Sequence, residues 1–322
     1  SEQIIPSLIL KNNLYGLEID KRASALSSFV LTIKALEKQR DFLINPVQPN
    51  ICYLENIKFE NHEIMEYMNE IGIDLFTFDF KNTIKQFEEA DNFGSLIVPQ
   101  LKDFESIRNT LTKKNLSSNL FLNSTHNRVL KLLDKVDFLS KKYSILIANP
   151  PYMGSKGMNP SLATFAKVNY SDSKADLFGM FIERSFQLIV KNGFLATINM
   201  QSWMFLSSFE KLRKKLISNY TLLTMVHIGA RGFDTIGGQV VSTTGFIFSK
   251  SKDDLQKGIF IRLTEGNSEA EKSIMLKNAI SNKDSPLIYR INPNKFNKIK
   301  GSPIAYWVSN EILNTFEFGL PL

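Results

Sequence analysis

Short apolar runs alternate with helical apolar patterns along this chain, and this alternation constrains its fold more than any other feature. The run at residues 14–19 is followed by apolar residues at helical spacing, namely Ala23, Leu26, Phe29, Val30 and Ile33. The same order returns after residue 143, where the run 144–148 precedes an apolar helical face over 178–189. Strands that alternate with helices form parallel sheets covered on both faces. An α/β fold is therefore predicted.

Turn and cap residues place the individual elements. Strands are expected over residues 14–19, 51–54, 144–148, 194–199, 224–228, 240–248 and 259–263. The runs 224–228 and 240–248 are close enough in sequence to form an antiparallel pair. Asp176 is predicted to cap the helix over 178–189, and Asn192-Gly193 to end it. Ser207-Ser208-Phe209-Glu210 fits a capping box that opens a further helix.

The stretch 60–142 differs in character from its surroundings. It is polar, rich in Asn, Lys and Glu, and looks helical over 81–90 and 126–139. We interpret it as a helical insertion between two parts of one core, at residues 1–59 and 143–265. Residues 266–322 contain Pro286, Pro293 and Pro303 and are expected to form an irregular C-terminal extension.

Composition excludes several classes of protein. Hydrophobic residues make up 43% of the 322 residues, so the chain is not disordered. A single cysteine, Cys52, excludes an internal disulfide, suits a reducing cytoplasm and is most simply a small core residue. No run of 18 apolar residues and no signal peptide are found, so a cytoplasmic protein without a membrane span is expected. The three histidines have no metal-ligand spacing.

Basic residues exceed acidic ones, and the net charge of +7 suits a partner that carries phosphates. Four basic side chains are candidates for phosphate contacts, and an equally good interpretation is a solvated helix face; they are Lys211, Arg213, Lys214 and Lys215.

Polar residues follow three of the predicted strands. Glu18 closes the first run, Glu55 follows the second, and Asn149 follows the run at 144–148. In open α/β sheets, ligands bind at the carboxyl ends of the strands. These three side chains are therefore expected to lie in one cleft.

Asn149 opens the tetrapeptide Asn149-Pro150-Pro151-Tyr152. Proline fixes φ and has no N–H, and it pushes the preceding residue toward an extended conformation. The turn is therefore stiff and its carbonyls point outward. The Asn149 side-chain oxygen and the Pro150 carbonyl could both accept hydrogen bonds from one amino group, which makes an aromatic amine a better nucleophile. Tyr152 offers a flat face for a heterocycle. The structural alternative is a tight turn that only ends a strand.

The tetrapeptide resembles the catalytic motif of adenine-specific DNA amino-methyltransferases, which are class I S-adenosylmethionine-dependent enzymes with a Rossmann-like sheet. Longer stretches resemble the PglX methyltransferases of BREX type 1 phage-defence systems: "NLYGLEIDKRASALSSFVLTIKA", "NPPYMGSKGMN", "DLFGMFIERSFQL", "TINMQSWMFLSSFEKLR", "GARGFDTIGGQVVSTTGFIF" and "GSPIAYWVS". The resemblance covers almost the whole chain.

The resemblance implies a role for each candidate residue toward S-adenosylmethionine. Glu18 would accept both ribose hydroxyls, and Ile19 would pack against the adenine of the cofactor. Glu55 would meet the adenine amino group, with Asn56 as its neighbour, and Phe181 would line the cofactor pocket. Each has a structural alternative: Glu18 as an acid at a helix N-terminus, Glu55 as a solvated loop acid, and Phe181 as a core residue.

The resemblance also implies that Asn149 and Pro150 bind the target amino group, and that Tyr152 and Phe233 sandwich the target adenine. Phe233 has the alternative of a buried loop aromatic. The partner is double-stranded DNA, from which the adenine must be flipped because its amino nitrogen is paired in the duplex. Other phage-defence subunits are possible partners.

The family's glycine-rich first motif should precede Glu18, and residues 1–17 do not contain it. We therefore expect the chain to be a fragment that begins after this motif, with a target-recognition region beyond Leu322. The predicted reaction is methyl transfer to the 6-amino group of adenine, without a metal. Two alternatives stay open: a protein-glutamine methyltransferase, and a non-enzymatic methyltransferase-like scaffold that binds DNA.

Overall fold

The computed structural model describes residues 4–114, 116, 119–234, 241–309, 311–312 and 315. The chain divides into two compact units, Ser1–Lys141 and Lys142–Leu322. Each unit has its own hydrophobic core and is described by itself.

Unit 1 starts with a pair of parallel strands and two helices. Strands β1 (Tyr15–Glu18) and β2 (Asn50–Tyr53) pair in parallel, with Glu18 opposite Tyr53. Helices α1 (Ile5–Asn12) and α2 (Lys21–Lys38) flank β1 in the sequence, and Asp20 caps α2 by accepting the N–H groups of Arg22 and Ala23. The predicted strands at 14–19 and 51–54 are confirmed.

The rest of unit 1 is helical, as the sequence predicts. It contains α3 (Asn61–Ile71), α4 (Phe78–Gln86), α5 (Ala90–Phe93), α6 (Phe104–Leu111) and α7 (Leu120–Ser140). One hydrophobic core joins these helices to β2 and the segment after it, because Cys52, Leu54 and Ile57 pack together with residues of α3, α4, α6 and α7. Residues 60–140 therefore share a core with β2. The division into a 60–142 insertion and a surrounding core stays a prediction.

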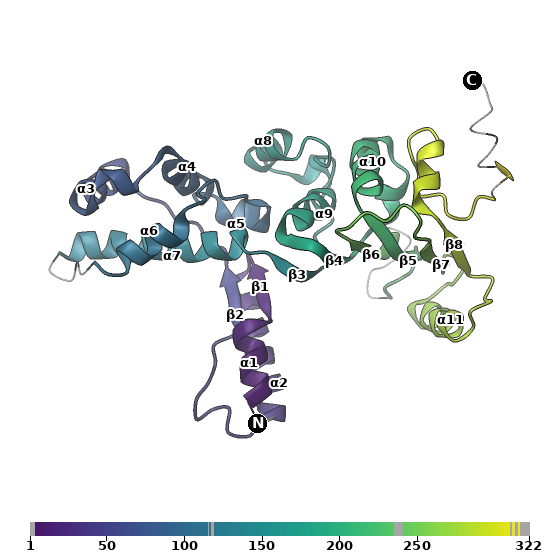
Figure 1. The fold of residues 1–322 in the computed structure, drawn as a ribbon, viewed down its shortest axis with the longest axis horizontal. Coiled ribbons are helices and arrows are strands. Elements are labelled where there is room, and N and C mark those ends of the chain that lie inside the picture. Colours follow the sequence, from purple (N-terminus) through teal and green to yellow (C-terminus); the bar gives the residue numbers. More distant parts are fainter. Residues whose placement is uncertain are drawn as a thin grey trace. The chain divides into compact units, whose positions relative to one another are not determined.

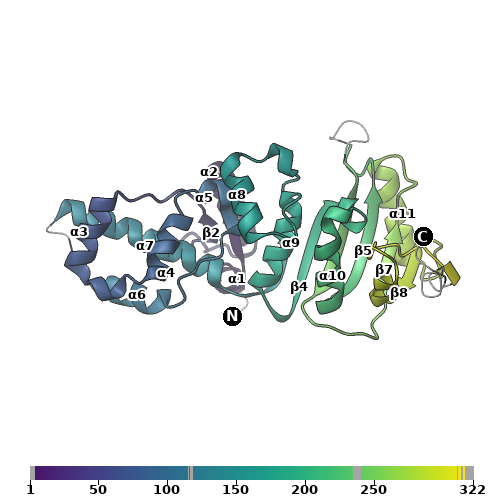
Figure 2. The same ribbon diagram turned by 90° about the horizontal axis from the view of Figure 1, so that it is seen from above.

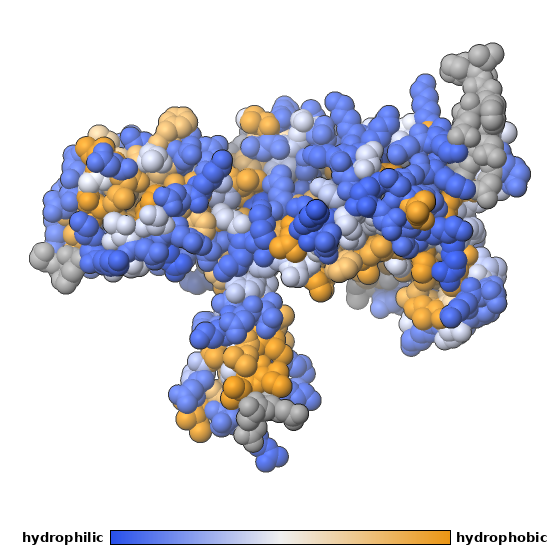
Figure 3. Space-filling view, in the orientation of Figure 1, coloured by the Kyte–Doolittle hydropathy of each residue, from blue (hydrophilic) through white to orange (hydrophobic). Residues whose placement is uncertain are grey.

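An apolar surface is exposed on α1 and α2. The stripe that predicted α2 is not buried: Leu26 and Phe29 are each 62% exposed, and Val30 and Ile33 are also exposed. Ile5 and Leu8 add to it from α1. Figure 3 shows apolar side chains over these two helices.

Unit 2 is built on a six-stranded sheet in the order β3-β4-β6-β5-β7-β8. The strands are β3 (Tyr143–Ala148), β4 (Ile189–Met200), β5 (Thr221–Gly229), β6 (Thr243–Ser249), β7 (Gly258–Arg262) and β8 (Ile288–Ile291). β3 and β4 are parallel, as are β5 and β7, whereas β6 is antiparallel to both β4 and β5. The antiparallel pairing of the runs near 224–228 and 240–248 is confirmed for the residues that the structure describes.

Helices pack on both faces of this sheet, although on the second face they cover only the part near β5 and β7 (Figures 1 and 2). On one face, α9 (Leu177–Leu188) and α10 (Glu210–Asn219) pack on β4, β5 and β6 and enclose the main core around Phe178, Trp203 and Phe248. On the other face, α11 (Glu269–Ser281) packs on β7 through Ala279. A further helix, α8 (Pro160–Asn169), lies between β3 and α9 in the chain. The predicted α/β fold is confirmed.

Residues 266–309 are more regular than expected, which corrects the prediction of an irregular extension. Ser268 caps α11 by accepting the N–H of Glu271 at 3.1 Å. β8 adds an antiparallel strand beside β7. Pro286 and Pro293 lie just outside β8, so they limit the strand and do not prevent it.

Two predicted boundaries are also wrong. Helix α10 begins at Glu210 without a side-chain cap, because a 3-10 turn (Ser207–Phe209) occupies the place of the expected capping box. Helix α9 ends at Leu188, and not at Asn192. Asn192 has a positive φ of 63°, but this turn lies within β4, where the Asn192 N–H donates to the Lys250 carbonyl.

Arg213 is buried in the core of unit 2, with 1% of its surface exposed, which excludes the phosphate contact considered from the sequence. Its guanidinium donates to four backbone carbonyls, those of Trp203, Leu206, Gly301 and Ser302. It therefore holds the chain after β8 against the segment after β4. The neighbouring basic residues Lys214 and Lys215 form ion pairs, with Glu210 and Glu183.

His227 forms a second buried polar network at the end of β5. Its Nε2 lies 2.6 Å from the Gln201 side-chain oxygen, and its Nδ1 lies 2.9 Å from the Tyr306 hydroxyl. Because the Gln201 oxygen can only accept, we assign the ring proton to Nε2, and the Tyr306 hydroxyl donates to Nδ1. Burial, together with Arg262 and Lys272, lowers the pKa of His227 to about 4. The ring is therefore neutral in the folded protein at physiological pH.

We predict that Arg213→Met lowers the free energy of unfolding by about 3 kcal/mol or more, because it leaves buried carbonyls without donors. Urea unfolding followed by circular dichroism measures this. Lys211→Met, an exposed change on the same helix, should shift the value by less than about 0.5 kcal/mol. Equal effects of the two changes would contradict the structural role of Arg213.

We also predict that acid destabilises unit 2 through His227. Between pH 6.5 and 4 the unfolded chain binds a proton at this ring that the folded chain does not, so stability falls as the pH falls. The loss attributable to His227 from pH 8 to pH 5 is about 2 kcal/mol. Urea unfolding at each pH should show a shallower pH dependence in His227→Gln than in the wild type. The exposed His62→Gln is the control, and an unchanged slope in His227→Gln would contradict the prediction.

Candidate active site

One edge of the six-stranded sheet collects the loops that follow four strands. β3, β4, β5 and β7 all run in the same direction, because β6 is antiparallel to both of its neighbours. Asn149, Gln201 and the segment 229–234 follow three of these strands and so lie at one edge. This is the edge at which parallel sheets bind ligands.

The turn Asn149-Pro150-Pro151-Tyr152 leaves this edge directly after β3. Asn149 and Pro151 are exposed, Pro150 is buried and Tyr152 is half-buried. The Tyr152 hydroxyl lies 3.4 Å from the Asn149 side-chain oxygen and 3.3 Å from the Ile198 carbonyl. The Tyr152 ring meets the buried Phe178 ring at right angles, with 6.2 Å between centroids. The turn therefore presents its amide to solvent while its tyrosine is held against the core.

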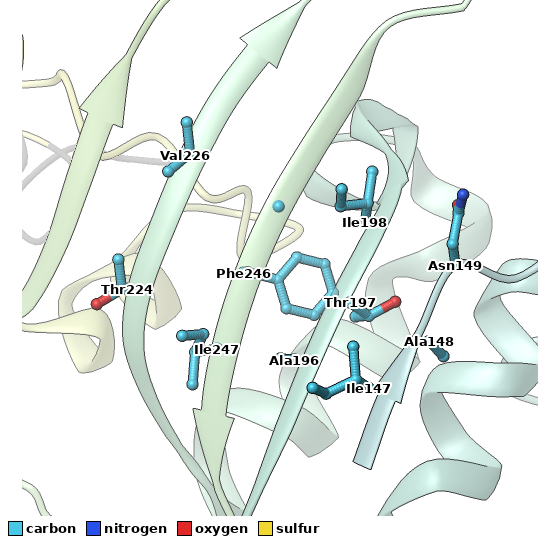
Figure 4. A pocket seen from close by; sticks show the side chains of 11 residues that line it. Ile147, Ala148, Asn149, Ala196, Thr197, Ile198, Thr224, Val226, Phe246 and Ile247 are labelled. Atoms are coloured by element: carbon cyan, nitrogen blue, oxygen red, sulfur yellow. The ribbon is translucent and has the colours of Figure 1, made fainter. Parts of the chain in front are cut away.

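Burial raises the pKa of the Tyr152 hydroxyl, so the hydroxyl stays protonated and can donate. Among the described residues, the Asn149 amide makes one hydrogen bond, in which its oxygen accepts from the Tyr152 hydroxyl. Figure 4 shows the Asn149 side chain beyond the end of β3. The amide is thus available to a further partner.

Phe233 lies on the loop that follows β5, and it is half-buried. Gly229 and Arg231 have positive φ values of 72° and 57°, which turn the chain sharply. The loop is tied to the start of α11, because Asp234 accepts the Glu269 N–H at 3.1 Å and donates its own N–H to the Glu269 carboxylate. β6 and β4 separate β5 from β3, a distance of about 14 Å. A sandwich by Tyr152 and Phe233 therefore stays a prediction.

Glu18 ends β1 in unit 1, and its carboxylate is ordered by its own loop. One oxygen, Oε1, accepts the N–H groups of Ile19 at 2.8 Å and Asp20 at 2.9 Å. The remaining oxygen is the natural acceptor for a ligand hydroxyl. Because β1 and β2 are parallel neighbours, Glu55 lies at the same edge as Glu18, as the sequence predicts. The expected shared cleft of these acids with Asn149 stays a prediction.

Glu55 is paired with a lysine that the sequence analysis did not single out. Its carboxylate lies 3.5 Å from the amino group of Lys135 on α7, which also donates to the Tyr53 carbonyl. Lys135 on α7 thus holds the end of β2 in place through Tyr53 and Glu55. The neighbouring Cys52 is buried, and burial raises its pKa to about 11, so its thiol is an unreactive core group as expected.

The segment 91–96 is a part of the site that the sequence analysis missed. A Cβ on Gly94 would lie 2.9 Å from the Ile19 side chain, so only glycine allows this close approach, and its φ of +54° also favours glycine. Asn56 accepts the Asp91 N–H at 3.0 Å, so its side-chain oxygen already holds this segment. The available signal was Gly94 itself, a glycine that follows the predicted helical stretch 81–90.

Phe181 lies beside the core face of α9 and not within it. The core face consists of Phe178, Ile182 and Phe186, whereas Phe181 is half-buried. The interpretation of Phe181 as a core residue is therefore weakened, and its contact with a ligand stays a prediction.

A shallow depression of about 400 Å³ lies on the sheet face opposite α9 and α10 (Figure 4). Its lining is mainly aliphatic, with Ile147, Ile198, Val226 and Ile247 from four strands, and Asn149 stands at its rim. The lining contains no charged residue. Its polar side chains are limited to Thr197, Thr224 and the rim residue Asn149, so we place the candidate site at the carboxyl edge.

The residues of unit 1 fit the adenosine half of S-adenosylmethionine. A ribose diol needs a carboxylate acceptor, which Glu18 provides. An adenine ring needs an apolar surface, and Ile19 is 47% exposed directly beside Glu18. The adenine amino group needs an acceptor, which Glu55 offers. Among the described residues no group of side chains could hold a metal ion, and no described helix has the length and apolar character needed to cross a membrane.

Two curated relatives match the chain over nearly its whole length. The chain is 37% identical to "Adenine-specific methyltransferase BrxX" of Escherichia coli O9:H4 (strain HS), over 97% of this chain and 27% of the relative. It is 34% identical to "Adenine-specific methyltransferase PglX" of Lacticaseibacillus casei (strain Zhang), over 96% of this chain and 26% of the relative. The chain thus spans about a quarter of the length of these relatives. The resemblance to PglX methyltransferases is confirmed.

The fold is similar to that of a solved restriction-modification enzyme. The structure of the ATP-dependent Type ISP enzyme LlaBIII bound to DNA superimposes with a TM-score of 0.52, at 15% identity, over 94% of this chain and 18% of that chain. Residues 12–233 match the family described as Eco57I restriction-modification methylase, which includes both the Glu18 edge and the Asn149 turn. The chain therefore belongs to the family of Eco57I restriction-modification methylases.

Proposed function

We propose that this chain is the methyltransferase part of a site-specific DNA adenine methyltransferase that acts in phage defence and restriction-modification. One observation carries the proposal: the Asn149-Pro150-Pro151-Tyr152 turn stands exposed at the carboxyl edge of the sheet, with its tyrosine fixed against Phe178. The names of the two relatives, both adenine-specific methyltransferases, support the choice of adenine.

The turn acts on the 6-amino group of the target adenine. Asn149 Oδ1 and the Pro150 carbonyl accept its two hydrogens, which increases the electron density on the nitrogen and turns its lone pair out of the ring plane. The stiffness of two consecutive prolines keeps both acceptors in place without further ordering at the moment of reaction. Tyr152 and Phe233 hold the flipped base between them. In the reaction the amino nitrogen would form a bond to the methyl carbon as the bond from that carbon to the cofactor sulfur breaks, and one amino hydrogen would leave as a proton to solvent.

S-adenosylmethionine supplies the electrophilic methyl group when it is bound. Glu18 holds its ribose, Ile19 and Glu55 hold its adenine, and Phe181 adds an aromatic wall. The free oxygen of Glu18 is directed by the two N–H groups that fix the other one. The segment 91–96 places Gly94 against Ile19, so it would border the adenine of the cofactor.

Double-stranded DNA is the proposed substrate, since an adenine amino group is accessible to the turn only after the base leaves the duplex. The LlaBIII structure, which is bound to DNA, has the same fold and supports this choice. We further propose a cytoplasmic location, where DNA and other phage-defence subunits are available as partners. The two core parts at 1–59 and 143–265, with the insertion 60–142 between them, form the methyltransferase region in this proposal.

We predict that Asn149→Ala in the full-length protein reduces methylation at least about 10³-fold, because an acceptor that acts on the reacting nitrogen is lost. Transfer of radiolabel from S-adenosylmethionine to DNA measures it. The exposed Asn219→Ala on α10 is the matched control and should keep wild-type activity. Both variants should unfold at the wild-type temperature.

Retained activity in Asn149→Ala would refute the assignment of the turn. The same labelling experiment decides between substrates when DNA and protein are offered separately. Label in protein and none in DNA would favour a glutamine methyltransferase, and label in neither would favour a non-enzymatic scaffold.

We predict that Glu18→Gln weakens S-adenosylmethionine binding by about 10- to 100-fold, the value of a hydrogen bond to a charged group. The glutamine oxygen can still accept the N–H groups of Ile19 and Asp20, so the loop keeps its shape, but its amide nitrogen cannot accept a ribose hydroxyl. Isothermal titration calorimetry of the full-length protein measures the affinity. Glu37→Gln, on the exposed surface of α2, should leave it unchanged.

A further inference from the structure

Asp176 has two partners that belong to different parts of the chain. Its Oδ1 accepts the N–H of Phe178 at 3.3 Å, which caps α9, and the N–H of Met153 at 3.0 Å, which directly follows the catalytic turn. The first partner was expected from the sequence, and the second was not. A helix cap alone needs only the first.

The bond to Met153 belongs to a short clamp between two segments. The Leu177 N–H donates to the Met153 carbonyl, and the Ser155 N–H donates to the Ala175 carbonyl, both at 3.0 Å. Gly154 and Asp176 form an antiparallel bridge within it. Residues 154–175, including α8, are therefore closed into a loop whose two ends meet at Asp176.

The clamp lies beside Tyr152 on two sides. Met153 is the next residue in the chain, so its N–H fixes the peptide bond that leaves Tyr152. Phe178, whose N–H shares the same carboxylate oxygen, supplies the buried ring against which Tyr152 packs. A second ring, that of Phe209, lies 5.2 Å from Phe178 and prevents it from moving away. Burial raises the pKa of Asp176, whereas the backbone N–H groups that its carboxylate faces lower it.

We propose that Asp176 is a positioning residue for the methyl transfer: by accepting both N–H groups it fixes Tyr152, and through the Tyr152 hydroxyl it fixes the amide of Asn149. This inference rests on the proposed function. Asp176 touches neither base nor cofactor, so it acts on the geometry of the turn. Its loss should slow the reaction of bound substrates while leaving their binding nearly unchanged.

Two substitutions separate positioning from capping. Asp176→Asn keeps an oxygen at the same place and can accept both N–H groups. Asp176→Ser keeps a good helix cap, but its shorter side chain does not reach Met153. Ser268→Ala, which removes the cap of α11 in the same unit, is the matched control for a loss of stability without a contact to the turn.

Steady-state methylation of DNA by the full-length protein tests the proposal. Asp176→Ser should lower kcat by about 10²-fold, as for a small displacement of a reacting group, with KM values for DNA and S-adenosylmethionine within twofold of wild type. Asp176→Asn and Ser268→Ala should stay within threefold of wild type. Thermal unfolding reports whether each variant is folded.

The proposal is overturned if Asp176→Ser loses no more activity than Ser268→Ala, or if its KM for S-adenosylmethionine rises in step with the loss. It is also overturned if kcat falls as far in Asp176→Asn as in Asp176→Ser, because the loss of activity would then follow from the loss of negative charge and not from the loss of the hydrogen-bond acceptor. Failure of the proposed function looks different, because the wild type itself would transfer no label to DNA.

Discussion

Pro150 and Pro151 have no backbone N–H, so β3 cannot continue its pairing with β4 beyond Ala148, the last residue of β3 in register. β4 itself continues to Met200, because β6 supports it from the other side. The sheet therefore has a step at its carboxyl edge. The Tyr152 hydroxyl fills this step, with its one hydrogen shared between the Ile198 carbonyl and the Asn149 side-chain oxygen, and the amide of Asn149 faces outward. The whole candidate site depends on this early end of one strand.

Buried polar groups hold the rest of that edge in place. Arg213 joins the segment after β4 to the chain after β8, and His227 joins the ends of β4 and β5 to Tyr306. The Arg213 guanidinium and both ring nitrogens of His227 have hydrogen-bond partners, which makes a rearrangement of these side chains costly. A turn that carries catalytic groups needs such support, because a rigid scaffold lets it present two hydrogen-bond acceptors without rearranging during the reaction.

Strands β1 to β7 and the turn could be predicted, because short, mainly apolar runs with clear breaks identify a strand from local sequence alone, whereas β8 was not predicted. The role of Arg213 could not, since its carbonyl partner at Gly301 lies 88 residues away. The second partner of Asp176 could not be predicted for the same reason, since Met153 lies 23 positions before it in the sequence. Helix α11 was missed because it buries only Lys272 and Ala279 and has no apolar stripe. Local patterns therefore predict elements, and contacts between distant segments decide which side chains are free to act.

The burial of Cys52 gives this chain a built-in reporter. The chain has one thiol, which lies in β2, and burial keeps it protonated and largely shielded from solvent. A thiol reagent can modify it only when the first unit opens, so the labelling rate follows the opening of that unit alone. The labelling rate of Cys52 therefore shows whether a substitution in the second unit also disturbs the unit that carries Glu18 and Glu55.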